Sequence, residues 1–175
     1  MTFTLRPVRP DEDADLLHGW VTQERARFWG MLDKSRDEVR DVYTYLDGLS
    51  THHAYLVHLD GEPIALFQTY EPAHDPVGEV YPVQEGDLGA HLFVAPGERV
   101  PGFTGRLAEF LVTTLFEDRA VQRVVCEPDV LNAASLRRVE RIGAELGPEV
   151  DLGWKRARLA FLTRAAAGLP PGQAS

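Results

Sequence analysis

The sequence predicts an α/β fold in which a mixed central β-sheet is flanked by helices. Apolar runs and amphipathic stretches follow one another as strand, two helices, a three-strand meander, helix, strand, helix and strand. The strands at 88–95 and 121–128 are joined through a helix, and such a connection makes two strands parallel. The apolar runs within 53–72 are instead joined by a tight turn, which makes them antiparallel. The sheet is therefore expected to contain both directions.

The N-terminal half is expected to form a strand, two helices and a hairpin, at residues 2–9, 10–31, 35–49 and 53–72. Acidic residues in the first turn of the first helix complement the positive end of the helix dipole. Ser35 is suited to cap the second helix, because a serine oxygen accepts a bond from a free backbone N–H there. Asp60 and Gly61 are typical of the tight turn of a hairpin.

The C-terminal half is expected to alternate loops, strands and helices, at residues 73–87, 88–95, 96–104, 104–117, 120–130, 132–143 and 150–164. The prolines and glycines of 73–87 and 96–104 oppose regular structure. We expect one domain over residues 1–165, because no internal repeat or linker divides the chain. Residues 166–175, rich in Ala, Gly and Pro, are expected to form a disordered tail.

Composition excludes several functional classes. A hydrophobic fraction of 44% with 26% charged residues is that of a soluble globular protein. A net charge of −9 opposes binding to nucleic acid or to an anionic membrane. Cys126 is the only cysteine, which excludes a disulfide scaffold and a Cys-based zinc site. The N-terminus lacks the apolar segment of a signal peptide, so we expect a cytoplasmic protein.

The loop at 96–104, between a strand and a helix, is a candidate anion site. Nearby lie three glycines, one hydroxyl and two arginines: Gly97, Gly102, Gly105, Thr104, Arg99 and Arg106. Backbone amides at a helix N-terminus bind a pyrophosphate, and glycines allow close approach. An ordinary strand-to-helix turn, with Thr104 as the N-cap residue, explains the pattern equally well.

A second candidate segment follows the strand at 121–128. Pro128 cannot donate to a ladder, so the strand is expected to fray and open a wedge beside its parallel neighbour. Asp129 and Asn132 stand at this opening, where a carboxylate can face a substrate amine and an amide can bind a ligand. The alternative, that Asp129 only caps or precedes the next helix, is the commoner role of aspartate.

His91, in the middle of a predicted strand, is the third candidate. Gly89 and Ala90 beside it leave space, and an imidazole near a carboxylate can serve as a general base. A lone strand histidine is more often a core or surface residue, and that alternative stays open. No pair of histidines has metal-ligand spacing on a helix face, so no metal is expected.

These segments resemble the GNAT acyltransferase superfamily, and within it the hydroxamate siderophore branch. The motifs are "HGWV…RFWGM", "YEPAHDPVGEVYPVQEGDLGAHLFVAP", "GFTG", "VVCEPDVLN" and "KRARLAF", and the similarity spans residues 3–163. The branch includes the aerobactin N-hydroxylysine acetyltransferases, the mycobactin lysine acyltransferase and the desferrioxamine N-hydroxycadaverine acyltransferases. Gly-x-His in one strand, with Glu-Pro-Asp-x-x-Asn after the next, is the most specific part of the match.

The resemblance implies a GNAT fold in which two parallel strands splay at an acyl-CoA site. Acetyl-CoA or succinyl-CoA would be the co-substrate, without a metal, and its pyrophosphate would lie on residues 97–104. His91 and Asp129 match the catalytic pair of the family. The cofactor contacts would come from ten residues: Phe93, Val94, Gly97, Arg99, Gly102, Phe103, Thr104, Gly105, Arg106 and Asn132.

The implied reaction is direct acyl transfer to an N-hydroxylated amine, such as N-hydroxycadaverine or N6-hydroxylysine. A monomer or homodimer would act on this small molecule, and five residues would line its pocket: Trp20, Trp29, Phe67, Tyr70 and Glu127. Core packing remains the alternative for at least two of the aromatic residues. Val139 stands where many relatives have a tyrosine that protonates the leaving thiolate.

Two further functions remain open from the sequence. One is acylation of an unhydroxylated amine, such as an aminoglycoside, a polyamine or a protein terminus, which the acidic charge would suit. The other is a non-catalytic CoA-binding module, since the cofactor loop departs from the usual pattern.

Overall fold

The computed structural model describes residues 1–173, and contacts between residues divide the chain into two compact units. The first comprises Met1–Thr69 and His91–Glu98. The second comprises Tyr70–Ala90 and Arg99–Ser175, of which residues 174–175 lie outside the described part. Whether the chain acts as the single domain expected from the sequence remains a prediction.

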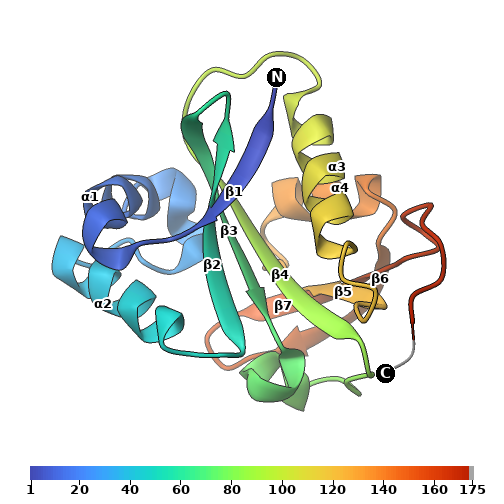
Figure 1. Cartoon of the computed structure of the whole chain (residues 1–175). Helices are drawn as coiled ribbons and strands as arrows, with labels where there is room; N and C mark the ends of the chain where they lie inside the picture. Colours follow the sequence, from blue (N-terminus) through green and yellow to red (C-terminus); the bar gives the residue numbers. More distant parts are fainter. Residues whose placement is uncertain (174–175) are drawn as a thin grey trace. The chain divides into compact units, whose positions relative to one another are not determined.

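The described residues contain seven strands, four α-helices and three 3-10 helices, joined by loops (Figure 1). Their bounds are β1 Phe3–Pro7, α1 Pro10–Val21, η1 Glu24–Trp29, α2 Arg36–Asp47, β2 His52–Leu59, β3 Glu62–Tyr70, η2 Pro72–His74, η3 Pro76–Glu79, β4 Asp87–Val94, α3 Phe103–Leu115, β5 Arg123–Cys126, α4 Ala133–Arg141, β6 Glu145–Asp151 and β7 Arg156–Thr163. Every helix among residues 1–173 is too short or too polar to cross a lipid bilayer.

The strands form a mixed sheet, as the sequence predicts. Within the first unit they lie in the order β1-β2-β3-β4, and within the second in the order β4-β5-β7-β6. β1 pairs with β2 antiparallel, β4 pairs with β5 parallel, and β7 pairs antiparallel with both β5 and β6. The helix that joins β4 to β5 therefore gives the expected parallel pair.

In the first unit, α1 and α2 pack against each other over an apolar core. The core includes Leu17 and Val21 of α1, Val39 and Tyr43 of α2, and Leu56 of β2. These residues recur at the spacing of one helix face or one strand face, so burial of that face orders each element.

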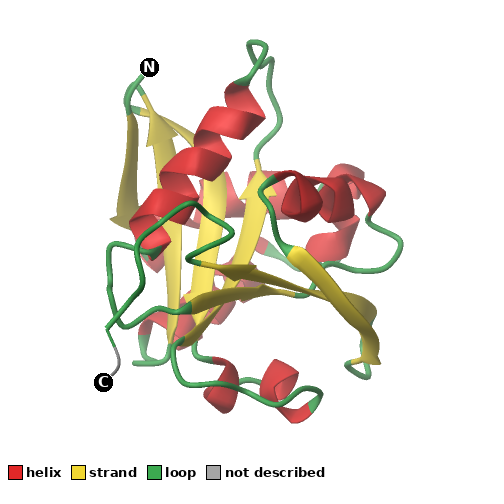
Figure 2. Ribbon diagram, turned by 90° about the vertical axis from the view of Figure 1, so that its right-hand side faces the viewer, coloured by secondary structure: helices red, strands yellow, loops and turns green. Residues whose placement is uncertain are grey.

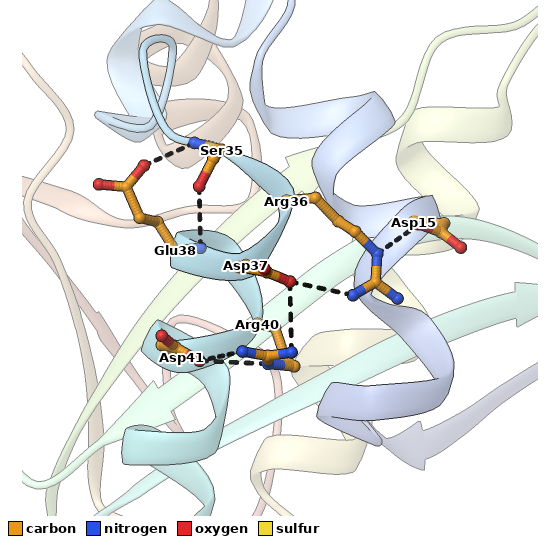
Figure 3. A network of polar contacts seen from close by, with 7 residues as sticks. All are labelled: Asp15, Ser35, Arg36, Asp37, Glu38, Arg40 and Asp41. Carbon is orange, nitrogen blue, oxygen red and sulfur yellow. Dashed lines mark hydrogen bonds and ion pairs between the residues drawn. The ribbon is translucent and has the colours of Figure 1, made fainter.

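The expected cap of α2 is present, and Figure 3 shows it. Ser35 Oγ accepts a hydrogen bond from the Glu38 backbone N–H at 3.2 Å, and Glu38 Oε2 accepts from the Ser35 N–H at 2.7 Å. Arg36 reaches Asp15 of α1 at 2.6 Å in the same view. The start of α2 is therefore fixed by a reciprocal cap and by a polar link to α1.

In the second unit, a buried ion pair joins the first residues of β4 and β5. Arg123 donates two bonds to Asp87, at 2.7 and 2.8 Å, and the Asp87 side chain is fully buried. Tyr81 donates to the same carboxylate at 2.9 Å. Asp87 and Arg123 are also Cα partners in the parallel ladder, so the pair fixes the strand register.

The last strand predicted, at 150–164, is present as β7 but begins later, at Arg156, and a further strand before it was not predicted. β6 and β7 form an antiparallel hairpin there, and β6 begins before the predicted strand, at Glu145. Gly147 and Pro148 interrupt the alternation that reveals a strand, and the register of the hairpin shifts between Leu146 and Glu149.

Three other boundaries also differ from prediction. The helix expected at 10–31 is divided, because α1 ends at Val21 and a separate 3-10 helix follows. The strand expected at 120–130 is shorter, since β5 spans only Arg123–Cys126. The expected loop at 73–87 contains η3, and η2 runs into it from Pro72; both are visible as short red segments in Figure 2.

Residues 166–173, where the sequence predicts disorder, make hydrogen bonds to the rest of the second unit. The Gln173 N–H donates to the Arg119 carbonyl at 2.9 Å, and Arg164 Nε donates to the Pro170 carbonyl at 2.8 Å. The last two residues of the predicted tail, 174–175, lie outside the described part.

Candidate active site

The parallel pairing of β4 with β5 ends early in the second unit. The last paired residues are Gly89 and Val125, although β5 continues to Cys126. Beyond β5 the chain continues along β7 instead, because Arg158 N–H donates to the Pro128 carbonyl at 2.9 Å. This pairing is the one expected of two parallel strands that separate after Gly89.

Gly89 is needed at this point for lack of space. A Cβ atom added there would lie 2.1 Å from the Tyr70 ring, far inside any real contact distance. The ring therefore packs directly against the backbone at the last paired position. Tyr70 is 2% exposed, so its phenol ring is a fixed part of this site.

A buried polar chain continues from Tyr70. Its hydroxyl donates to Glu127 Oε2 at 2.7 Å. Burial, followed by the charge of Glu127, raises the pKa of Tyr70 well above its usual value. The phenol therefore keeps its proton and acts as a donor to the carboxylate.

Lys155 reaches the same glutamate from the turn between β6 and β7. Its Nζ donates to the Glu127 carbonyl oxygen at 2.7 Å and lies 3.7 Å from Glu127 Oε1. The sequence predicted Glu127 and Tyr70 for the acceptor pocket and offered Lys155 only as a possible partner of a substrate carboxylate, so its contact with Glu127 was not predicted. The sequence gives no signal for this contact, since 28 positions separate the lysine from its partner.

Asp129 and Asn132 shape the turn from β5 to α4. Asp129 Oδ1 accepts from the Leu131 N–H at 2.8 Å, so Asp129 stabilises the turn that precedes α4 and does not cap the helix. Asn132 is the N-cap residue of α4, and its Oδ1 accepts from the Ser135 N–H at 3.1 Å. These bonds leave Asp129 Oδ2 and the Asn132 amide nitrogen as the atoms for a ligand.

The loop before α3 is the predicted anion site, and two of its glycines have positive φ angles. Gly97 and Gly102 adopt φ values of 142° and 81°, which favour glycine. Gly102, not Thr104, is the N-cap residue, so the alternative in which Thr104 caps the helix is wrong. The amides of Thr104 and Gly105 therefore belong to the first turn, where N–H groups have no acceptor within the helix.

Space is available on the first turn of α3. A Cβ atom added at Gly105 would meet nothing within 4 Å, and Arg106 lies exposed beside it. Arg99 lies over the Phe103 ring, with its guanidinium carbon 5.0 Å from the ring centroid. The turn thus combines open space, two backbone donors and two arginines, which is what a phosphate group needs.

In the first unit, His91 lies against aromatic side chains. Its ring centroid is 6.2 Å from that of Trp29, edge to face, and the Trp29 Nε1 donates to Tyr43 Oη at 3.2 Å. Phe93 lies 5.7 Å from Trp29 and 6.4 Å from Trp20. Trp29 is held by these contacts, and it holds one side of His91.

The other predicted residues divide between core and surface. Trp20, Phe67, Phe93 and Phe103 are each at least nine-tenths buried, as the core alternative for some of the aromatic residues requires. Val94 is half-buried at the end of β4. His91 belongs to the first unit and Asp129 to the second, and their pairing remains a prediction.

Cys126, at the end of β5, is unsuited to attack a substrate. Burial, with a smaller contribution from the charge of Glu127, raises the pKa of its thiol to about 12. The reactive species of a cysteine is the thiolate, which is scarce near neutral pH at such a pKa. The arrangement therefore favours direct transfer over a covalent acyl-cysteine.

Three further observations concern a proton donor, a metal site and a cavity. Val139 is buried in α4, so this position supplies no proton donor for a leaving group. Residues 1–173 contain no group of three or more side chains able to hold a metal ion. A cavity of about 170 Å³ in the first unit is lined by other residues: Pro7, Val8, Tyr43, Asp47, His52, His53, Ala54 and Tyr55.

Comparison with known proteins identifies similar chains. A family model described as "Acetyltransferase (GNAT) domain" matches residues 9–152. The lysine N-acyltransferase MbtK of Mycobacterium sp. (strain MCS) is 27% identical over 172 residues, covering 97% of this chain and 70% of that protein. The N-hydroxyputrescine acetyltransferase of Acinetobacter baumannii is 25% identical over 148 residues, covering 85% of this chain and 69% of that protein.

A solved structure with a similar fold is AAC(6')-Ib in complex with paromomycin and acetyl-CoA. Its TM-score is 0.82 at 25% sequence identity, covering 95% of this chain and 96% of that one. A related structure describes the same protein as an aminoglycoside acetyltransferase in complex with coenzyme A.

Proposed function

This chain belongs to the GNAT acetyltransferase family, and from that premise we propose that it acylates an N-hydroxylated amine to form a hydroxamate in siderophore biosynthesis. It is an enzyme, an N-acyltransferase that uses acyl-CoA as co-substrate. The proposal concerns the acceptor, for which N-hydroxycadaverine and N6-hydroxylysine are the candidates. Such a role in iron acquisition suits a cytoplasmic monomer or homodimer.

The observation that carries the proposal is the pair of relatives named above. One is named for acylating lysine and the other for acetylating N-hydroxyputrescine, and both matches extend over at least 85% of this chain. The Glu-Pro-Asp-x-x-Asn segment adds support, because it follows the last parallel pair and forms the turn into α4. A substrate site is expected where strand ends and helix N-termini meet.

In the proposed mechanism, the acceptor nitrogen attacks the thioester carbonyl directly. A C–N bond forms, the C–S bond breaks, and the acceptor N–H proton passes to His91, while Asp129 orients the imidazole or holds the hydroxylamine. Asn132 contacts the arm of the coenzyme near the thioester. The first turn of α3 holds the pyrophosphate, and the leaving thiolate takes its proton from solvent.

The choice of acceptor follows from basicity. An N-hydroxylated amine is less basic than an alkyl amine, so it is largely neutral at pH 7 and needs no deprotonation before attack. Aligning it with the thioester contributes on the order of 7–11 kcal/mol without a covalent intermediate. A weak base such as His91 is then sufficient.

Substitution of the catalytic pair tests the mechanism. His91→Ala and Asp129→Ala should each lower kcat by about 10²- to 10⁴-fold, because a general base contributes that much. Coenzyme A binding, measured by calorimetry, should persist. His58→Ala, in a histidine of β2, is the matched control and should keep full turnover. Unchanged turnover in both site variants would exclude this mechanism.

The acceptor is tested by release of free thiol from acetyl-CoA and succinyl-CoA. N-hydroxycadaverine, N6-hydroxylysine and their unhydroxylated parents are compared at equal concentration. Release with hydroxylated acceptors alone supports the proposal, and the comparison of the two shows whether a carboxylate is recognised.

A second candidate is acylation of an unhydroxylated amine, such as an aminoglycoside or a polyamine. The similarity to AAC(6')-Ib favours it, since that structure covers 95% of this chain. The net charge of −9 also suits a polycationic acceptor. Faster thiol release with kanamycin or cadaverine than with any hydroxylated acceptor would select this function.

A further inference from the structure

The contact between Lys155 and Glu127 is more defined than a surface ion pair. The turn that carries Lys155 is closed by a bond from the Leu152 N–H to the Lys155 carbonyl at 3.0 Å. The side chains of Lys155 and Glu127 are only 19% and 2% exposed. An ammonium group held by a backbone carbonyl and beside a buried carboxylate has little freedom to bind elsewhere.

Glu127 stands at the position where the acceptor is expected. It follows the last residue of β5 and precedes Pro128, two positions beyond Val125, the last parallel partner. Tyr70 already occupies its Oε2 with a 2.7 Å hydrogen bond. The carboxylate is therefore fixed in place by a phenol on one oxygen and an ammonium group near the other.

The charges of this group decide which acceptors it attracts. A buried carboxylate alone would attract a protonated amine to the site. With Lys155 beside it, Glu127 is neutralised, so this attraction is lost, and the lysine also repels a second ammonium group. A neutral hydroxylamine is affected by neither change.

We propose that Lys155 determines acceptor specificity, by neutralising Glu127 so that neutral N-hydroxylated amines are selected over cationic alkyl amines. This inference rests on the proposed function and extends it, because it names the residue that separates the two acceptor classes. Lys155 acts through Glu127, so it is a positioning residue and not a catalytic one. It is also not available to bind a substrate carboxylate.

The test compares kcat/KM for N-hydroxycadaverine with that for cadaverine, using acetyl-CoA at one pH. Lys155→Met keeps most of the length of the side chain and removes its charge, so cadaverine should gain relative to N-hydroxycadaverine by about tenfold or more. Lys155→Arg keeps the charge and should hold the wild-type ratio within about twofold. An equal change for both acceptors in Lys155→Met would overturn the inference.

Two more variants keep the test decisive if Lys155→Met folds poorly, which circular dichroism and thermal unfolding will show. Glu127→Gln leaves the lysine charge unbalanced and should lower the relative use of cadaverine further. The double variant Glu127→Gln/Lys155→Met is again neutral and should return toward the wild-type ratio. A ratio that stays constant across both variants would also overturn the inference.

The acceptor preference of the wild-type enzyme distinguishes failure of the proposed function from failure of the inference alone. If the wild-type enzyme prefers cadaverine, the proposed function and the inference both fail. If it prefers N-hydroxycadaverine while the ratio does not respond to the charge at position 155, the inference alone fails.

Discussion

At the scale of single residues, Asp13 shows how a carboxylate stabilises the start of α1. It accepts two bonds from Arg6, both at 2.7 Å, and one from the Arg9 N–H at 2.7 Å. Burial alone would raise its pKa, but these bonds prevail and lower it below the usual value. The folded protein therefore favours the charged form of Asp13, and protonation of this carboxylate lowers the stability of the fold.

Because the pKa of Asp13 is lowered, the stability that it contributes should depend on pH. The contribution of Asp13 is complete well above pH 4 and is lost as the pH falls through the lowered pKa. Asp13→Asn should cost about 2 kcal/mol of unfolding free energy at pH 7, and less below pH 3. Asp11→Asn, an exposed acid of the same helix turn, is the control. Urea unfolding at both pH values measures the difference, and an equal loss at both would contradict this role.

At the scale of elements, α2 depends on its N-terminal cap. Ser35→Ala removes the oxygen that accepts the Glu38 N–H and should lower the unfolding free energy by about 1 kcal/mol. Ser50→Ala, an exposed serine in the loop before β2, should change it by less than about 0.5 kcal/mol. Thermal unfolding of both variants checks the prediction, and equal melting temperatures would show that the cap is not needed.

A helix or strand can be predicted from the sequence when the residues that fix it are close together in the chain. Ser35 and the Asp60-Gly61 turn act on near neighbours, so the sequence predicted α2 and the hairpin. β6 is set by its pairing with β7 and carries Gly147 and Pro148, so no local pattern revealed it.

The candidate site, too, could be predicted from the sequence only in part. The sequence predicted the segment after β5 and the Gly-rich loop, because both carry local motifs. The contacts of Asp87 with Arg123 and of Lys155 with Glu127 join positions 36 and 28 residues apart, and only the folded chain brings them together.

At the scale of the whole molecule, Arg164 joins distant parts of the second unit. Its guanidinium donates to the carbonyls of Phe116, Asp118, Val121 and Pro170, at 2.8 to 3.2 Å. Arg164→Met should cost about 3 kcal/mol, because it leaves buried carbonyls without donors. It should also speed hydrogen exchange of the Leu169 and Gln173 amides. Exposed Arg137→Met is the control, and protection of both amides in Arg164→Met would contradict this role.

The contact between Gly89 and Tyr70 has a consequence for how this sequence can change. Because a methyl group at position 89 would occupy the space of the Tyr70 ring, Gly89 cannot gain a side chain while Tyr70 is present. Among descendants of this chain, a side chain at position 89 should occur only together with a small residue at position 70. Such a descendant would lose the phenol that donates to Glu127, so an exchange at position 89 would also leave this buried carboxylate with one hydrogen bond fewer.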